Sequence, residues 1–212
     1  MIEVVHTDAA LLVLSKPSGL LAVPGRGQDK QDCLSARVRA RYPDALVVHR
    51  LDMATSGLMV MARGIAVQRI LSQSFARREV LKRYEALVHG VLETPPETEN
   101  GWSSIDLPLL SDWPNRPLQK VDPLHGKPSL TRWRILGHED GATRVELEPV
   151  TGRSHQLRVH LAALGYPVLG DPLYGHEVAK SRAGRLLLHA RTLGFFHPVS
   201  GEWLEFESPV PF

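Results

Sequence analysis

The sequence predicts an α+β protein whose core is a mixed, mainly antiparallel β-sheet with flanking helices and long loops. Segments with strand-like alternation outnumber helical ones, and they do not alternate regularly with helices as in a doubly wound protein. The 212 residues are 43% hydrophobic and 23% charged, which is typical of a globular protein. A chain of this length can bury a sizeable core, and we expect one large domain.

The strands are predicted from polar and apolar alternation. Residues 2–14 form two short alternating pieces joined by a turn at Asp8, which is typical of a hairpin. Residues 57–63 are a compact apolar strand, and residues 81–91 alternate, with Tyr84 on one side and Arg83 on the other. The remaining expected strands cover residues 131–136, 143–149, 185–196 and 202–208.

Three segments show helical spacing of apolar residues: 33–42, 67–77 and 154–164. Pro43 ends the first of them and Gly165 ends the third. Residues 93–100 are rich in Pro and Glu and are expected to be an exposed connector. Residues 106–128 hold five prolines and little periodicity, so we expect a long loop, which a compact domain tolerates mainly for function.

Several classes of protein are excluded by composition. The single cysteine, Cys33, cannot form an internal disulfide, and no Cys/His cluster accompanies it to make a zinc site. No apolar run reaches the length of a membrane span, and the N-terminus lacks the basic and apolar regions of a signal peptide. We therefore expect a cytoplasmic protein without a metal and without a membrane partner.

The positive charge is concentrated in one stretch. Residues 30–90 carry eleven Lys and Arg against five acidic residues, a net charge of +6, and arginine supplies 19 of the 25 basic residues of the chain. The planar guanidinium group donates several hydrogen bonds in fixed directions, which suits phosphate and base recognition. The pattern favours a polyanionic partner such as a nucleic acid, although such charges can also simply solvate a helix face.

Two polar clusters and one aromatic residue could carry chemistry. His49 to Gly57 places Asp52 beside Arg50 and before an apolar strand, so this carboxylate either caps a turn or acts as a catalytic nucleophile or base. Thr151 to His160 places Arg153 at the expected start of a helix, where an anion is favoured. That anion is either a phosphate or Asp52.

The other candidates also have two interpretations. Tyr84 follows two cations and either packs in the core or stacks on a base while the cations contact phosphate. His155 and His160 are five residues apart, so they do not share a helical face as the ligands of a zinc protease do. We expect these two histidines to be structural or to contact a nucleic acid.

The two clusters and the Lys82–Gly90 segment together resemble the RluA family of RNA pseudouridine synthases. Lys16-Pro17-Ser18-Gly19 and Leu186-Leu187-Leu188-His189-Ala190 resemble two further motifs of that family, so the similarity runs almost end to end. The resemblance implies the pseudouridine synthase catalytic fold, with residues 1–212 as one catalytic domain and no N-terminal S4 domain. Residues 112–117 resemble a loop of the dual-specificity RluA subgroup, which modifies a 23S rRNA hairpin-loop uridine and a tRNA anticodon-loop uridine.

The resemblance also implies roles for individual residues. Asp52 is the catalytic carboxylate, and Arg153 pairs with it and keeps it ionised. Tyr84 stacks on the uracil and offers its phenol oxygen as a proton acceptor, while Leu188 covers the opposite face of the base. Arg50 fills the space that the flipped uridine leaves, unless it forms a plain salt bridge with Asp52 or Asp44. The reaction needs no cofactor.

The expected partner is RNA, in the form of 23S rRNA and tRNA stem-loops, with no DNA and no membrane, and we expect a monomer. The residues expected to contact the phosphate backbone are Arg77, Arg78, Lys82 and Arg83. The segment 112–120 offers groups for reading RNA shape, or is a structural Pro-rich loop; these groups are Trp113, Asn115, Arg116 and Lys120.

Other functions remain possible from the sequence: a synthase with a single rRNA or tRNA substrate, or an RNA-binding relative without catalysis. The non-catalytic protein would need the basic surface but not Asp52, Tyr84 and Arg153 together. A metal-dependent hydrolase built on the ten histidines is disfavoured because the histidines are scattered.

Overall fold

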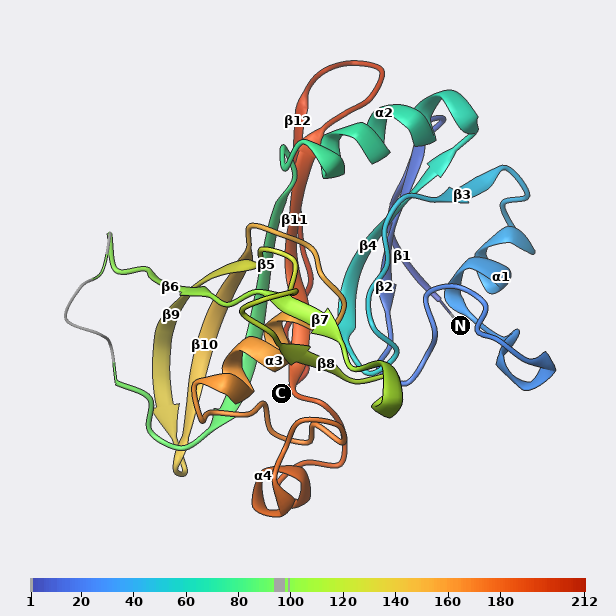
Figure 1. Cartoon of the computed structure of the whole chain (residues 1–212). Coiled ribbons are helices and arrows are strands. Elements are labelled where there is room, and N and C mark those ends of the chain that lie inside the picture. Colours follow the sequence, from blue (N-terminus) through green and yellow to red (C-terminus); the bar gives the residue numbers. More distant parts are fainter. Residues whose placement is uncertain (1, 94–97, 99) are drawn as a thin grey trace. The chain divides into compact units, whose positions relative to one another are not determined.

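The computed structural model describes residues 2–93, 98 and 100–212 (Figure 1). It forms two compact units, which are described separately. Unit 1 comprises Met1–Lys82 and His189–Pro211, and unit 2 comprises Arg83–Leu188 together with Phe212. No helix in the described part of the chain is long and apolar enough to cross a membrane.

Unit 1 is built on a mixed β-sheet. The strands are β1 (Glu3–Thr7), β2 (Leu11–Lys16), β3 (Ala45–Val47), β4 (Ser56–Arg63), β11 (Leu188–Phe196, from His189 onward) and β12 (Trp203–Glu207). Their order is β1-β2-β4-β11, with β3 paired to β4 and β12 paired to β11. Among the strands described in this unit, β4 and β11 alone pair in parallel, with Ser56 opposite His189 and Gly57 opposite Ala190. All other pairs in this unit are antiparallel.

The core of unit 1 lies beside helix α2 (Ile65–Ala76), which contributes Leu71 to it. Strands β2 and β4 supply alternate apolar side chains, including Val13 and Val60, to the same cluster. A shorter helix, α1 (Leu34–Arg39), and a 3₁₀ turn, η1 (Gln28–Lys30), precede β3. Gly57 is required where β4 meets β11: its φ is +114°, and an added Cβ would overlap the backbone of Ala190.

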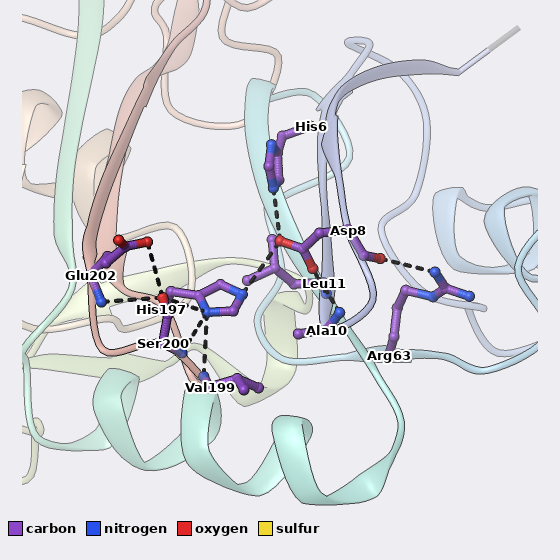
Figure 2. Close-up of polar contacts among 9 residues, drawn as sticks. All are labelled: His6, Asp8, Ala10, Leu11, Arg63, His197, Val199, Ser200 and Glu202. Atoms are coloured by element: carbon purple, nitrogen blue, oxygen red, sulfur yellow. Dashed lines mark hydrogen bonds and ion pairs between the residues drawn. The ribbon is translucent and has the colours of Figure 1, made fainter.

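The turn at Asp8 closes the β1–β2 hairpin, as the sequence predicts. The Asp8 carboxylate accepts hydrogen bonds from the backbone N–H groups of Ala10 (2.6 Å) and Leu11 (2.8 Å). It also contacts the rings of His6 (2.9 Å) and His197 (3.4 Å), as Figure 2 shows. Burial opposes ionisation, but the hydrogen bonds from His6 and from the turn hold the pKa of Asp8 below its ordinary value. This carboxylate therefore ties the β1–β2 turn to the end of β11.

Unit 2 contains a four-stranded antiparallel sheet in the order β5-β10-β9-β6. Its strands are β5 (Leu81–His89, from Arg83 onward), β6 (Ser103–Asp106), β9 (Leu130–Glu139) and β10 (Ala142–Pro149). A separate hairpin pairs β7 (Leu109–Ser111) with β8 (Gln119–Val121), and the 3₁₀ turn η2 (Trp113–Asn115) forms its tip. Helix α3 (Gln156–Ala163) packs against β8, β9 and β10, and α4 (Glu177–Ser181) places Ala179 in a small buried cluster with Leu87.

The predicted fold class is confirmed: the strands outnumber the helices, and the sheet pairing is mixed and mostly antiparallel. The expectation of an unstructured loop over residues 106–128 is wrong, because residues 109–111 and 119–121 pair as a hairpin. Each strand of that hairpin has three residues, which is too short to show periodicity. The connector expected at 93–100 lies mostly outside the described residues, since 94–97 and 99 are not described.

Candidate active site

Asp52 lies in the turn that leads into β4, and the Lys16–Gly19 segment holds this turn in place. The backbone carbonyl of Asp52 accepts a hydrogen bond from the N–H of Thr55 (3.1 Å). The next carbonyl, that of Met53, accepts from the N–H of Gly19 (2.8 Å). Asp52 itself is half-buried. These two hydrogen bonds fix the backbone that carries its carboxylate.

Lys16 makes the strongest of these attachments. Its side chain is fully buried, and its ammonium group donates to the carbonyls of Pro17 (2.9 Å), Leu20 (2.8 Å) and Met53 (3.1 Å). A buried ammonium group is costly unless its donors are satisfied, so this arrangement specifies one conformation of the loop. The hydroxyl of Ser18 adds a bond to the carbonyl of Ala54 (2.7 Å).

His49 fixes the segment before Asp52 to strand β4. Its Nε2 accepts a hydrogen bond from the backbone N–H of Val60 (3.0 Å), and its ring stacks on Phe75 with centroids 4.4 Å apart. Burial, with a smaller contribution from Lys82, lowers the pKa of His49 to about 3. The imidazole is therefore neutral at neutral pH, with its proton on Nδ1, and it acts as a structural acceptor.

The neighbouring residue Arg50 is exposed. One alternative interpretation joined it to Asp44, but the carboxylate of Asp44 pairs with Arg63 (3.0 Å) instead. The exposed guanidinium of Arg50 suits contact with a partner better than packing within the chain.

His189 links the start of β11 to the start of β4. Its Nδ1 lies 2.9 Å from the hydroxyl of Ser56, and its Nε2 lies 3.1 Å from the hydroxyl of Ser208. The ring is buried, so these two serine hydroxyls satisfy both nitrogens. Leu188, the residue before it in the chain, is also buried and belongs to unit 2.

In unit 2, Tyr84 lies on β5 opposite Leu147 of β10 and is half-buried. Its strand neighbours Arg83 and Glu85 point to the other face of the sheet, because side chains alternate along a strand. The guanidinium of Arg83 forms ion pairs with Glu146 (3.6 Å) and Glu148 (3.7 Å) there.

Arg83 belongs to a larger charged face. Its guanidinium lies over the ring of Trp102 (5.3 Å), as do those of Arg132 (5.3 Å) and Arg134 (4.8 Å). A phosphate contact by Arg83, as the sequence predicts, would have to replace these ion pairs and the contact with Trp102. It would also lie on the face of the sheet opposite Tyr84. The structure thus gives Arg83 a role in stabilising the sheet.

The turn that carries Arg153 is held by Gln156, the first residue of α3. The side-chain oxygen of Gln156 accepts from the hydroxyl of Thr151 (2.7 Å) and from the backbone N–H of Arg153 (3.0 Å). The backbone N–H of Arg153 is thereby used within the turn and is not available to an anion. The guanidinium of Arg153 is exposed and donates through Nε to the carbonyl of Pro128 (3.3 Å).

The two histidines of this motif are structural. His160 is buried between the hydroxyl of Thr131 (2.9 Å) and the carbonyl of Leu107 (3.0 Å), and burial lowers its pKa. His155 adopts a left-handed conformation before α3, and its Nδ1 is hydrogen-bonded to the hydroxyl of Tyr174 (2.6 Å). Among the residues that the structure describes, no group of three His, Cys, Asp or Glu could hold a metal ion.

The remaining RNA-contact candidates lie in three places: after α2, at the start of β5 and on the β7–β8 hairpin. Arg77 and Arg78 follow the end of α2, and both are exposed; Arg78 has a positive φ of 63°. Lys82 is half-buried. The other candidates, Trp113, Asn115, Arg116 and Lys120, lie on the β7–β8 hairpin and are exposed.

Comparison with known proteins identifies the family. A sequence model of the RNA pseudouridylate synthase family matches residues 10–163. The chain is 45% identical over 212 residues to the dual-specificity RNA pseudouridine synthase RluA of Pasteurella multocida, covering all of this chain and 94% of that protein. It is 46% identical over 210 residues to the protein of the same name from Escherichia coli strain K12, covering 99% of this chain and 93% of that protein.

The chain belongs to the RluA family of RNA pseudouridine synthases. A solved structure of human RNA pseudouridylate synthase domain containing 1 superposes with a TM-score of 0.80 at 31% identity, covering all of this chain and 84% of that one. The chain is therefore an isomerase that acts on RNA, and the non-catalytic and metal-dependent alternatives are not supported.

Sequence analysis missed several residues that hold these turns. Lys16 and His189 were noted only as parts of motifs, although a lysine inside an apolar strand end is itself a signal of an unusual buried group. The roles of Gln156 and Tyr174 depend on partners 25 residues and 55 residues away in the chain, at Thr131 and Gln119, and no local pattern predicts them.

Proposed function

We propose that this enzyme converts specific uridines to pseudouridine in both 23S rRNA and tRNA stem-loops. The observation that carries the proposal is the identity of about 45% over the full chain to enzymes named as dual-specificity RNA pseudouridine synthases. The geometry of the Asp52 turn supports it, because Lys16, Gly19 and His49 fix a half-buried carboxylate in unit 1.

The reaction breaks the bond between N1 of uracil and C1′ of the ribose and forms a bond from C5 to C1′. The proton on C5 leaves and N1 gains a proton, so no atom is lost and no oxidant or cofactor is needed. Asp52 supplies the catalytic carboxylate that acts on the nucleotide. The family resemblance supports Arg153 as the residue that acts together with Asp52.

Tyr84 stacks on the uracil while the base turns, and its phenol oxygen takes up the C5 proton as the hydroxyl releases its own proton, so that the phenol is regenerated. Leu188 contacts the opposite face of the base. The alternation on β5 supports the role of Tyr84, because it keeps Tyr84 apart from the ion pairs of Arg83. An apolar wall on one side and an aromatic ring on the other suit a planar base that must rotate without leaving.

Cationic side chains bind the RNA away from the reacting atoms. The target base leaves its stack at a cost of a few kcal/mol, which is smaller in a loop. Arg50 is exposed beside Asp52 and takes the vacated position, where its planar guanidinium stacks on neighbouring bases. Arg77, Arg78 and Lys82 contact the phosphate backbone.

We further propose that the enzyme works in the cytoplasm as a monomer consisting of one catalytic domain, without a cofactor, on RNA and not on DNA or membranes. Light scattering on the RNA complex checks this: one chain per stem-loop is expected, and two chains would contradict it.

Tritium release tests the dual specificity. Transcripts labelled with tritium at C5 of uridine are prepared for total tRNA and for 23S rRNA hairpins. The enzyme is expected to release tritium from one uridine of an rRNA hairpin and from one anticodon-loop uridine of tRNA. Release from only one class of RNA would contradict the dual assignment, and release from none would contradict the proposed function.

A further inference from the structure

The tip of the β7–β8 hairpin exposes a tryptophan that the catalytic assignment does not use. Trp113 begins the 3₁₀ turn η2, and 67% of its surface is accessible to solvent. A ring left this exposed in the free protein keeps most of its surface available for contact with a partner.

Arg116 covers one face of this ring. Its Cζ lies 3.7 Å from the ring centroid of Trp113, and its Nε donates to the backbone carbonyl of Trp113 (3.1 Å). A guanidinium that lies this close to an indole face is held by a cation–π interaction. Since one face is covered and most of the residue is accessible, the opposite face is open to solvent.

The tip is rigid before any ligand arrives. The backbone N–H of Asp112 donates to the carbonyl of Leu118 (2.9 Å), and that of Leu118 donates to the carbonyl of Asn115 (3.1 Å). Next to the tip, the N–H of Gln119, the first residue of β8, donates to the hydroxyl of Tyr174 (2.9 Å). A preformed ring loses little conformational entropy on binding.

The chemistry of the tip suits a nucleobase better than a protein surface. Within residues 109–121, all of which the structure describes, Trp113 is the one large hydrophobic side chain that is exposed, whereas protein docking sites gather several such side chains around an aromatic anchor. The side-chain amide of Asn115 donates a hydrogen bond to the carboxylate of Asp112 (2.9 Å), so this acidic group already has a partner within the turn. Arg116 and Lys120 remain exposed, and they favour an anionic chain.

We propose that the open face of Trp113 stacks on one unpaired nucleobase of the RNA, other than the uridine that is modified. Arg116 fixes the indole from behind and places a positive charge next to the stacked nucleotide. Only one base can be accommodated, because the second face of the ring is occupied. The inference rests on the proposed function for the identity of the RNA, and it assigns the hairpin to substrate choice rather than to chemistry.

A thermodynamic cycle on affinity tests the proposal. Equilibrium dissociation constants are measured for wild type and Trp113→Ala with a 23S rRNA hairpin and a tRNA anticodon stem-loop. Each loop position is replaced in turn by an abasic nucleotide. At one position, the abasic change and Trp113→Ala are each expected to weaken binding about 5- to 150-fold, and together no more than either alone. Additive losses at every loop position, or unchanged affinity of Trp113→Ala, would overturn the proposal.

Two further variants give the cycle its controls. Trp113→Phe keeps a stacking ring and is expected to retain most of the affinity. Trp203→Ala removes another partly exposed tryptophan (43%), on β12 of unit 1, and is expected to bind as wild type does. An equal loss in Trp203→Ala would show that the effect is not specific and would overturn the proposal.

The same RNAs separate the two levels of inference. Pseudouridine formation by wild type reports the proposed function, whereas the cycle reports only binding. If wild type forms pseudouridine and the cycle is additive, the stacking proposal fails alone. If wild type modifies neither RNA and the cycle still shows coupling, the proposed function fails and the stacking contact stands.

Discussion

The half-buried His49, whose imidazole is neutral, should make the stability of this enzyme fall on mild acidification. In the unfolded chain the imidazole titrates near its ordinary pKa of 6.5, whereas in the folded protein its pKa is about 3. Between these values the unfolded chain binds a proton that the folded chain excludes. The stability that His49 contributes is therefore complete above 6.5 and is lost progressively as the pH falls toward 3.

The size of the effect follows from these two values. Lowering the pH from about 7 to about 5 should cost about 2 kcal/mol of unfolding free energy through His49 alone. The matched variant is His49→Gln, whose side-chain oxygen can still accept from the N–H of Val60 but does not titrate. Urea unfolding of both proteins, followed by far-UV circular dichroism at the two pH values, measures the difference.

Wild type is expected to lose about 2 kcal/mol more than His49→Gln on acidification, because all other titrating groups are shared. Equal losses in the two proteins would refute the reasoning, since they would mean that the imidazole titrates alike in the folded and unfolded chains. A pH titration of the His49 ring by NMR in the folded protein gives the same answer directly: no protonation is expected at about pH 5.

Three further predictions concern other residues. Gly57→Ala should lower the unfolding free energy by about 3 kcal/mol or more, because the new Cβ overlaps the Ala190 backbone at a positive φ; a loss under about 1 kcal/mol in urea unfolding would contradict this. Arg158→Met should lower the unfolding free energy by about 3–5 kcal/mol, because it leaves the buried carboxylate of Asp171 without its guanidinium partner. Adding Asp171→Asn should recover part of this loss, and no recovery in the double variant would argue against the pair. Arg77→Ala should reduce the slope of log RNA affinity against log salt concentration by about one charge. Arg83→Ala should leave this slope unchanged, because Arg83 is ion-paired within the sheet. A reduced slope for Arg83→Ala would show that Arg83 does contact phosphate.

The parts of the fold that sequence predicts best are those with long periodic segments. Strand β4 is a continuous apolar run, and the turn at Asp8 has an acidic side chain placed to accept from the following backbone groups, so both are read correctly. Helix α2 begins at Ile65, two residues before the start that its apolar spacing indicates. Its first two residues, Ile65 and Ala66, are exposed and so do not belong to the buried face that defines this spacing. The three-residue strands β7 and β8 were missed because a pairing of that length leaves no alternation to detect.

The residues proposed for the candidate site come from the sequence, whereas the contacts that hold them in place come from the structure. Asp52, Tyr84 and Arg153 are each marked by neighbouring residue types and by the resemblance to the family. The groups that hold them in place act over long distances in the sequence: the ammonium of Lys16 reaches the carbonyl of Met53, and Ser56 bonds to His189. Such contacts depend on tertiary structure, and residue spacing carries no record of them.

Arg83 has two interpretations that its local sequence pattern does not separate. A cation beside an aromatic residue suggests a nucleic-acid contact, but strand alternation sends adjacent side chains to opposite faces. Glu146 and Glu148 on the neighbouring strand then meet Arg83 on its own face. The strand was predicted correctly, and its alternation favours a role for Arg83 within the sheet over a phosphate contact.

The central claim is that the Asp52 carboxylate performs the isomerisation. The most direct measurement is single-turnover tritium release from C5-labelled uridine in a 23S rRNA hairpin, with wild type and Asp52→Asn compared at saturating enzyme. RNA affinity is measured in parallel. We expect wild type to release tritium and Asp52→Asn to release none while it binds the RNA with nearly unchanged affinity. Release by Asp52→Asn at a rate comparable to wild type would contradict the account.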